Sequence, residues 1–403
     1  MNLLKKALGY VVRRLTLTEP EGWNTRPSHA GETVTPDSAL SLSTVWACTN
    51  LLAGTIASLP LKFYSGPATQ GGAAVTDHPV YKVLAESPNA DQTPMDFWEF
   101  LVVSLELWGN AYARKVMSGN RLIALVPVAP DAVAVSRRSD GKLLYRFSDE
   151  GRYYELTEEG VFHIRGFGGG PLGGMSTLSF ARHSFGLAQA IEKAAGGTFA
   201  NGLRPSGLLK FAQFLTKEQR EVAEQRMVEK FVGAVNAGRP MVLEGGTEWQ
   251  QLTINPEDAQ MLQSRAFSVE DICRFFGVPP FMVGHTEKST SLGTGLEQQL
   301  QGFQKFTLRR RLKRIEQAIS KQLLSPADRS KLKPKFNVEG LLRADSKARS
   351  DFYAAMIRNG IMTVNEVRAL ENLAPIEGGD VARTQSQNIP LGHNGGPPLE
   401  DGQ

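Results

Sequence analysis

Residues 255–324 read NPEDAQMLQSRAFSVEDICRFFGVPPFMVGHTEKSTSLGTGLEQQLQGFQKFTLRRRLKRIEQAISKQLL, and the organisation of the chain can be worked out from this segment. Asn255 is followed by Pro256 and two acidic residues, a combination that predicts a helix start. Asparagine accepts hydrogen bonds from free backbone amides, proline fits the first turn, and carboxylates complement the helix dipole. The helix should end near Phe276, because the following Gly-Val-Pro-Pro cannot continue it.

A polar loop and a second, longer helix follow this first helix. Residues 285–295, HTEKSTSLGTG, contain a single apolar residue and no periodic pattern, which predicts an exposed, mobile loop. A helical pattern then runs from Leu296 to about Leu324, a length of roughly 40 Å. The apolar residues before the middle of this helix are Leu296, Leu300 and Phe303, and those after it are Leu308, Leu312, Ile315, Ile319 and Leu323. The two stripes are displaced by roughly 130°, so we predict a kink or a change of packing partner between Phe303 and Leu308.

The composition is that of a globular, cysteine-poor protein. With 403 residues, 41% of them hydrophobic, the chain is long enough for two or three domains with their own cores. Cys48 and Cys273 are the only cysteines, which excludes a disulfide framework and suits a reducing compartment. The histidines show no ligand spacing with each other or with cysteine, so we expect no metal. His163 and His183 are interpreted as hydrogen-bonded structural residues.

Membrane insertion is not expected, because no run of about 18 apolar residues is present. The N-terminal segment MNLLKKALGYVVRRL is basic but lacks the cleavage site of a secretory signal. As a basic amphipathic helix it could touch a membrane surface. The preferred interpretation is a short helix that is docked on neighbouring structure or frayed, within an N-terminal arm over residues 1–40.

Positive charge is concentrated in one region of the chain. The net charge is only +4, yet residues 305–349 contain fourteen Lys or Arg and four acids, a local charge of +10 that leaves −6 for the rest. Such asymmetry is compatible with a polyanion nearby. A solvated helix face explains the basic residues equally well, because those opposite the later apolar stripe are Arg309, Arg310, Lys313, Arg314 and Lys321.

Residues 41–175 are predicted to form an α+β domain. A helix is expected from about Thr35 to Leu59, where Pro60 stops it, and a strand over residues 61–64 follows. A short helix precedes a second one that starts at Thr93-Pro94 and is closed by Gly109-Asn110. Phe97, Trp98 and Trp108 occupy apolar positions of that helix and are assigned to the core. Alternating patterns predict strands over residues 111–116, 122–127, 132–136, 143–147 and 161–164.

A glycine-rich segment raises the possibility of a nucleotide-binding enzyme. Residues 168–173, GGGPLG, from Gly168 to Gly173, match the dinucleotide fingerprint between a strand and a helix. Against this, Pro171 stiffens the loop, the acid about 20 residues on is Glu192 within a helix, and no repeated βαβ pattern follows. A flexible hinge is the preferred interpretation. Neither a G-x-S-x-G motif nor a P-loop is present, and we expect no enzyme.

The remaining segments are a small insert and a C-terminal helix pair. A long helix over residues 176–201 precedes an insert with an extended segment at 208–214, a capped helix at 216–232 and strands at 241–244 and 249–254. If the helices flanking this insert pack antiparallel, its ends should lie close together. After Leu324 a basic, proline-containing linker leads to two helices joined at Asn359-Gly360, the second starting with a capping box at Thr363. The tail from about residue 382 is expected to be disordered.

Several blocks in this order resemble the tailed-phage portal family, specifically the short portals of long-tailed phages. The resemblance covers about residues 41–380 and is more specific than any single motif. The blocks are HPVYKVLAESPNADQTPMDFWEFLVVSLELWGNAYA, FANGLRPSGLL, MVLEGGTEWQQLTINPEDAQMLQSRAFSVEDICRFFGVPPFMVG, the polar loop, and LRRRLKRIEQAI.

The resemblance implies a ring, usually of twelve subunits, at one vertex of a capsid. Double-stranded DNA is pumped in through such a ring and later leaves through it. The implied partners are the terminase large subunit, the major capsid protein and the head–tail adaptor, with no cofactor. The implied location is the virion, after assembly in the host cytoplasm.

The family also implies a division of the chain into parts. These are an arm (1–40), an α/β wing (41–175), stem helices (176–202 and 255–284) around a clip (203–254), a tunnel loop (285–295), a long kinked wing helix (296–324), a wing return with a helical crown (325–381), and a disordered tail (382–403). A monomeric scaffold that binds nucleic acid remains a further alternative.

The resemblance and the charge pattern together select candidate site residues. A conduit must contact phosphates without holding them, since each neutralised phosphate adds salt-dependent affinity. In the loop, Lys288 could touch phosphates while Glu287 limits their retention. The tunnel-loop candidates are His285, Thr286, Glu287, Lys288, Ser289, Thr290 and Ser291. Possible DNA-facing or intersubunit basic residues are Arg309, Arg310, Lys313 and Arg314.

Overall fold

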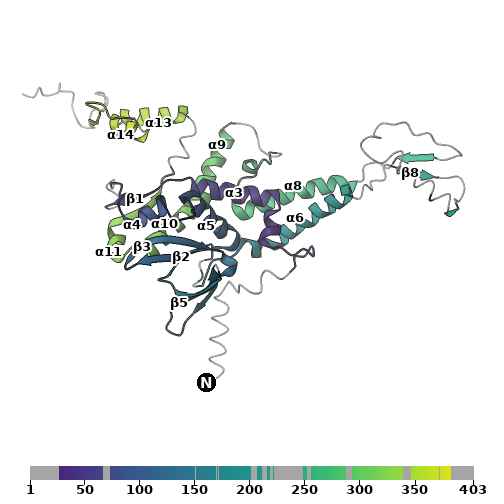
Figure 1. The fold of residues 1–403 in the computed structure, drawn as a ribbon. Coiled ribbons are helices and arrows are strands. Elements are labelled where there is room, and N and C mark those ends of the chain that lie inside the picture. The colour runs from purple at the N-terminus through teal and green to yellow at the C-terminus, as the bar shows by residue number, and fades with distance from the viewer. Residues whose placement is uncertain are drawn as a thin grey trace, which may run out of the picture.

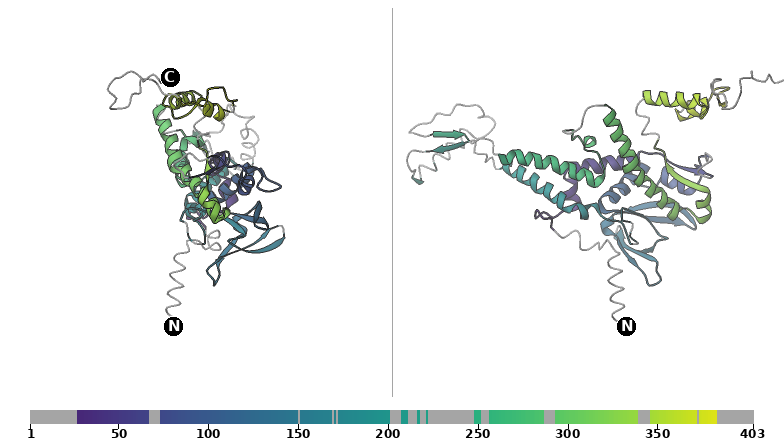
Figure 2. Two further views of the ribbon diagram at one scale, coloured as in Figure 1. Left: turned by 90° about the vertical axis from the view of Figure 1, so that its left-hand side faces the viewer. Right: turned by 180° about the vertical axis from the view of Figure 1, so that it is seen from behind.

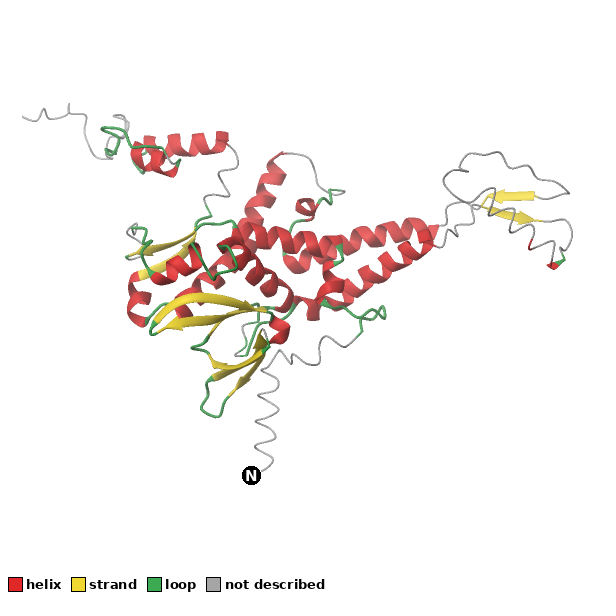
Figure 3. Cartoon of the chain, in the orientation of Figure 1, coloured by secondary structure: helices red, strands yellow, loops and turns green. Residues whose placement is uncertain are grey.

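The computed structural model describes most of the chain, and its predicted α+β class is confirmed. The described residues are 27–66, 73–149, 151–168, 170, 172–200, 207–210, 216–217, 221, 248–251, 256–286, 293–338, 346–371 and 373–382. Helices form the centre of the body, and two three-stranded sheets lie together on one side of them (Figure 3). Two helices project from this body toward a small strand pair (Figure 1). None of the described helices has both the length and the apolar character that a membrane span requires.

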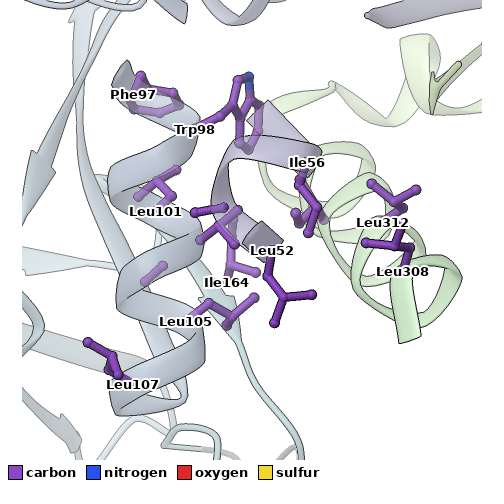
Figure 4. Close-up of a cluster of buried hydrophobic side chains, with 14 of the residues drawn as sticks. Leu52, Ile56, Phe97, Trp98, Leu101, Leu105, Leu107, Ile164, Leu308 and Leu312 are labelled. Atoms are coloured by element: carbon purple, nitrogen blue, oxygen red, sulfur yellow. The ribbon is translucent and has the colours of Figure 1, made fainter. Parts of the chain in front are cut away.

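The core is built around α3 (Ser43–Ala57) and α5 (Pro94–Trp108). Leu52 and Ile56 of α3 are buried between α5 and the helix that carries Leu308 and Leu312 (Figure 4). As predicted, the α5 residues Phe97 and Trp98 belong to this core, and Trp108 packs against it partly buried.

The ends of α5 show why it forms where the sequence predicts. The Thr93 hydroxyl accepts a hydrogen bond from the Asp96 amide while the Asp96 side chain accepts one from the Thr93 amide, a reciprocal cap that satisfies two free donors. At the other end Gly109 takes a left-handed conformation (φ +70°) that favours glycine and ends the helix.

The single helix expected from about Thr35 to Leu59 is wrong, because the segment is broken. Thr35 caps a short helix, α2 (Pro36–Leu40), with Ser38 as its capping-box partner. The chain then turns, and Leu42 is extended where α3 begins. Gln189 donates hydrogen bonds to the Ser38 carbonyl and hydroxyl oxygens, so a distant helix stabilises the break. The residues around Ser38 carry no sequence pattern that predicts this contact.

The strands form antiparallel pairs throughout the described sheets. One sheet has the order β3-β2-β7, another β4-β5-β6, and β1 pairs with β10. The elements of the body not yet given are β1 (Leu61–Ser65), α4 (Pro79–Ala85), β2 (Asn110–Ser118), β3 (Arg121–Val128), the 3-10 turn η1 (Pro130–Ala132), β4 (Ala134–Arg137), β5 (Leu143–Asp149), β6 (Arg152–Thr157), β7 (Val161–Arg165), α11 (Pro326–Lys331) and β10 (Leu332–Phe336).

Two of these strands, β6 and β10, are missing from the sequence prediction. The segment LKPKF has the composition of a basic linker, yet Leu332, Pro334 and Phe336 are buried and the lysines between them are exposed. β10 pairs with β1, with Leu61 opposite Phe336. Proline is tolerated in such a pair because an edge strand does not need every amide hydrogen bond.

The projection consists of α6 (Thr177–Ala200) and α8 (Pro256–Phe276), which lie side by side (Figures 1 and 2). They run antiparallel. Ser184 is hydrogen-bonded to Asp271, and residues later in α6, Ala188 and Glu192, line the same pocket as residues earlier in α8, Arg265 and Ser268. At its far end, β8 (Gly207–Lys210) pairs antiparallel with β9 (Glu248–Gln251). The predicted strand at 241–244 and nearly all of the predicted helix at 216–232 lie outside the described residues.

The long helix is irregular where the sequence predicts a change of face. α9 (Gly293–Gly302) begins before the expected Leu296, and α10 (Arg309–Leu323) continues it. Between them Phe303–Leu308 is π-helical, labelled η4. A π-helical turn holds an extra residue and so rotates the faces on its two sides relative to each other. This accounts for the two displaced apolar stripes and confirms the predicted position of the irregularity.

The predicted C-terminal helix pair is confirmed as α13 (Ser346–Arg358) and α14 (Val364–Leu370). Gly360 is left-handed between them, and Thr363 forms a capping box with Glu366. The buried Asn365 side chain bonds to the Ile376 backbone and fixes the segment after α14. The N-terminal helix expected within residues 1–26 and the disordered tail expected after residue 382 lie outside the described residues.

Candidate nucleic-acid interface

The candidate loop is held at its base by α8 and a tight connection. Gly277 is left-handed after α8, the 3-10 turn η3 (Pro280–Val283) follows, and Gly284 is left-handed again. The His285 amide donates to the Pro280 carbonyl oxygen, and the His285 ring lies 3.9 Å from a Glu270 carboxylate oxygen. His285 therefore packs beside α8 and belongs to the base of the loop.

Of the other loop candidates only Thr286 is described, and it is exposed. Glu287, Lys288, Ser289, Thr290 and Ser291 lie outside the described residues. Their contact with DNA stays a prediction.

The four basic candidates on α10 have different surroundings. Arg309 and Arg310 are exposed. Lys313 is also exposed but pairs with Glu316 at 3.1 Å. Arg314 is half-buried, and this burial lowers the pKa of its guanidinium. Their contact with DNA or with a neighbouring subunit stays a prediction.

A groove that sequence analysis missed lies between η4, α10 and β10. Its volume is about 370 Å³, and its apolar lining includes Leu308, Leu312 and Phe336. Its basic lining residues are Lys305, Arg309, Lys313 and Lys335. Lys335 joins them only because β10 folds back beside α10, a pairing that a linker interpretation cannot reveal.

A buried ion pair fastens α10 to the body. Arg311 donates two hydrogen bonds of 2.6 Å to the Glu106 carboxylate on α5. It also donates to the Phe276 carbonyl oxygen at 2.9 Å and to that of Thr307 at 3.2 Å. Thr307 in turn donates through its hydroxyl to the Gly277 carbonyl oxygen at 2.6 Å.

This network joins α5, the end of α8 and the π-helical segment at one point, so the helix before the loop is fixed to the long helix that follows it. In the sequence Arg311 is one member of the basic run over residues 305–349. The available signal was that Arg311 borders the apolar stripe of α10 and Glu106 interrupts an apolar run of α5.

His163 forms a second anchor, at the other end of α10. Its amide donates to the Gln322 side chain at 2.8 Å, and that side chain donates back to the His163 carbonyl oxygen at 2.7 Å. The ring nitrogens lie 3.0 Å from Asn110 Oδ1 and 3.2 Å from the Tyr145 hydroxyl. The predicted structural role of His163 is therefore confirmed.

Two other polar groups complete these contacts. Lys115 donates to the Gln322 carbonyl oxygen at 2.8 Å, and burial lowers the pKa of Lys115 to about 8. The predicted structural role of His183 is also confirmed, because its Nδ1 accepts a hydrogen bond from the His29 amide and the two rings stack.

The His163 environment predicts a pH dependence of stability. Burial, followed by the nearby Arg165 charge, holds the pKa of His163 well below its ordinary value of 6.5. The folded protein keeps the ring neutral while the unfolded chain takes up a proton, so this contribution is complete above pH 6.5 and is lost as the pH falls. We expect the free energy of unfolding to fall by up to about 1.4 kcal/mol per pH unit below that point.

The measurement is urea unfolding at several pH values between about 7.5 and about 5.5. His163→Gln is the matched control, since it keeps polar atoms but cannot titrate. Its stability should vary less with pH than that of the wild type, and equal slopes for the two proteins would contradict this assignment.

The glycine-rich segment has the wrong surroundings for a dinucleotide site. β7, which precedes it, pairs antiparallel with β2, whereas the fingerprint belongs to a parallel βαβ unit. The flanking Gly166 and Gly174 pack against Gly109, where an added Cβ would lie 2.5 Å and 2.3 Å from the Gly109 carbonyl oxygen. Close backbone packing, rather than phosphate binding, explains these two glycines.

No group of metal-ligating side chains occurs among the residues that the structure describes. Cys48 of α3 and Cys273 of α8 are buried with their sulfur atoms 3.9 Å apart. The contact with Cys273 and burial both raise the pKa of the Cys48 thiol. These thiols link the base of the projection to the core.

Comparison with known proteins identifies consistent relatives. The family model described as "Phage portal protein" matches residues 43–372. The portal protein of Enterobacteria phage HK97 is 36% identical over 383 residues, covering 93% of this chain and 90% of that protein.

Among solved structures, a chain from the virion of a native gene transfer agent particle has a TM-score of 0.62 and 24% identity, covering 85% of this chain and 94% of that one. A chain from the neck of that particle, computed with C12 symmetry, has a TM-score of 0.60 and 24% identity, covering 84% of this chain and 92% of that one. At this level of identity the structures establish a shared fold.

Proposed function

The chain belongs to the phage portal protein family, and from this we propose that it forms a ring at one capsid vertex through which double-stranded DNA enters and leaves. A ring of twelve copies is supported by the similar fold in a neck with C12 symmetry. The partners in this proposal are the terminase large subunit, the major capsid protein and the head–tail adaptor. The protein then resides in the virion after assembly in the bacterial host cytoplasm.

One observation carries the proposal: the end of α8, before the polar loop, and η4, after it, are joined to α5 by the Arg311 network. A loop on rigid supports can be held at a constant position while DNA moves past it. Within the ring, we assign residues 285–295 to the channel constriction, residues 41–175 to the wing, and residues 176–202 and 255–284 to the stem. Residues 203–254 form the clip and residues 346–371 belong to the crown.

The chemistry required of the channel differs from catalysis. Affinity for DNA rises with each phosphate that a basic side chain neutralises, so a conduit needs few such contacts. Lys288 provides one positive charge in the loop, next to Glu287 and several hydroxyl groups. The more basic α10 face is assigned to phosphates outside the constriction or to contacts between subunits. We propose no catalytic role and no cofactor.

The first experiment measures the mass and symmetry of the purified protein by native mass spectrometry, with averaged electron-microscope views along the particle axis. A closed ring with an open channel is the expected result. A strict monomer at all concentrations would favour the scaffold alternative, which also predicts salt-sensitive retention of DNA by the monomer. Saturable nucleotide binding that is lost on Gly170→Val would instead revive the enzyme alternative.

The role of the loop is tested by deleting residues 287–291 and measuring the length of packaged DNA and its retention. We expect shorter or less well retained DNA, since the constriction widens. The matched control removes charge alone, as Lys288→Gln. Unchanged packaging and retention in the deletion variant would remove the gating role and leave the ring proposal standing.

A further inference from the structure

The projecting helices expose large apolar side chains on one face. On α8, Phe267 is 57% exposed and Phe275 is 42% exposed, and on α6 Leu187 is 48% exposed and Phe180 is 47% exposed. Phe267 and Phe275 each lie four residues from Asp271, and on α6 Ser184 lies between the other two. The Ser184 hydroxyl donates to Asp271 at 2.6 Å. The two stripes therefore meet in one surface, which we name the stem patch.

The centre of this patch is held in place although it faces solvent. Arg274 bonds to Asp271 at 2.7 Å and lies over the Phe267 ring at 5.5 Å. A guanidinium above an aromatic face is attracted by the ring electrons. The patch is thus an ordered combination of aromatic rings and one arginine, residue types that are enriched at the energetic centres of protein interfaces.

A further exposed aromatic residue, Trp46, lies on α3, the helix that contacts the other side of α8. Cys273 follows Asp271 by two residues, about 200° around the helix, so it faces away from the patch centre. Its sulfur contacts Cys48 on α3. Trp46 precedes Cys48 by two residues, again about 200°, and is 58% exposed. The stem patch and Trp46 therefore lie on opposite faces of the paired helices α3 and α8.

We propose that the stem patch of one copy packs against the Trp46 face of the next copy in the ring. This inference rests on the proposed ring function. A closed ring of more than two identical chains requires a head-to-tail contact between two different surfaces, and each chain carries both. If the stem patch bound the same patch on a second copy, assembly would end at a dimer. An apolar patch on one face of the chain and an exposed tryptophan on the opposite face provide the two different surfaces that the ring needs.

The contact is tested by cysteine cross-linking in the full chain. The variant carries Trp46→Cys and Phe267→Cys in a Cys48→Ala, Cys273→Ala background and is oxidised with copper phenanthroline. The expected result is a ladder of covalent multimers that ends at the ring size. Each single variant should give no ladder. The matched control pairs Phe267→Cys with Ile123→Cys, an exposed position (49%) on β3, and should also give none.

A second measurement keeps the native cysteines. Phe267→Glu and Trp46→Glu should each abolish the ring in native mass spectrometry while circular dichroism stays unchanged, and Ile123→Glu should leave the ring intact. Rings that persist in both charged variants, or a wild-type ring without the expected ladder, would overturn the contact and leave the ring function standing. Dimers from a single-cysteine variant would overturn it in favour of self-pairing. A wild type that never forms a ring would overturn both.

Discussion

Replacement of Arg311 by alanine is expected to lower the free energy of unfolding by about 3–5 kcal/mol. The substitution leaves the Glu106 carboxylate buried without its two hydrogen bonds of 2.6 Å. It also removes the donor to the Phe276 carbonyl oxygen at the end of α8. An unpaired buried charge costs far more than the loss of an exposed ion pair, because burial keeps water from replacing the missing partner. Denaturant unfolding measures the change.

Two variants separate the charge effect from loss of packing. Arg310→Ala removes an exposed guanidinium from the preceding position and should change stability by no more than about 0.5 kcal/mol. Glu106→Leu combined with Arg311→Met replaces the ion pair by apolar groups and should recover most of the lost stability, because no buried charge remains unpaired. If Arg311→Ala lowered the free energy of unfolding as little as Arg310→Ala does, the ion pair would not be what holds α10 to the body.

Replacement of Gly109 by alanine is expected to destabilise the protein by about 2–5 kcal/mol. An added Cβ would lie 2.0 Å from the Met175 carbonyl oxygen, a backbone atom that cannot move aside without shifting the start of α6. The left-handed φ of +70° adds a conformational cost for any residue with a Cβ. The change is measured by thermal and denaturant unfolding.

Gly119→Ala is the matched control for Gly109→Ala. Gly119 is also left-handed, with φ +59°, but an added Cβ would meet nothing within 4 Å. Gly119→Ala should therefore lower the free energy of unfolding only by the conformational cost of about 1–2 kcal/mol. Equal effects of the two substitutions would show that packing at the glycine junction contributes little.

The parts of the fold that sequence analysis predicted depend on local chemistry. Thr93 and Gly109 set the ends of α5 through hydrogen bonds and backbone angles within a few residues. The π-helical segment could be placed because both apolar stripes belong to one continuous helix. Such signals need no knowledge of the rest of the chain.

The parts that were missed depend on partners far away in the sequence. β10 becomes a strand because it pairs with β1, more than 260 residues earlier in the chain, and its own residues resemble a linker. The break before α3 is held by Gln189. At the candidate site, Arg311 changes from a surface charge to a buried anchor only once Glu106 is beside it. Lys335 likewise reaches the basic groove through strand pairing.

The thiol pair between α3 and α8 gives the protein a chemical reporter of its own motion. Thiol reagents attack the thiolate, and a buried thiol reacts only after local opening exposes it to the reagent. Both sulfur atoms are buried where the base of the projection meets the core. The labelling rate of the unaltered protein therefore follows the frequency with which these helices separate. Comparison of free subunits, closed rings and DNA-filled particles would show at which stage of assembly that motion stops.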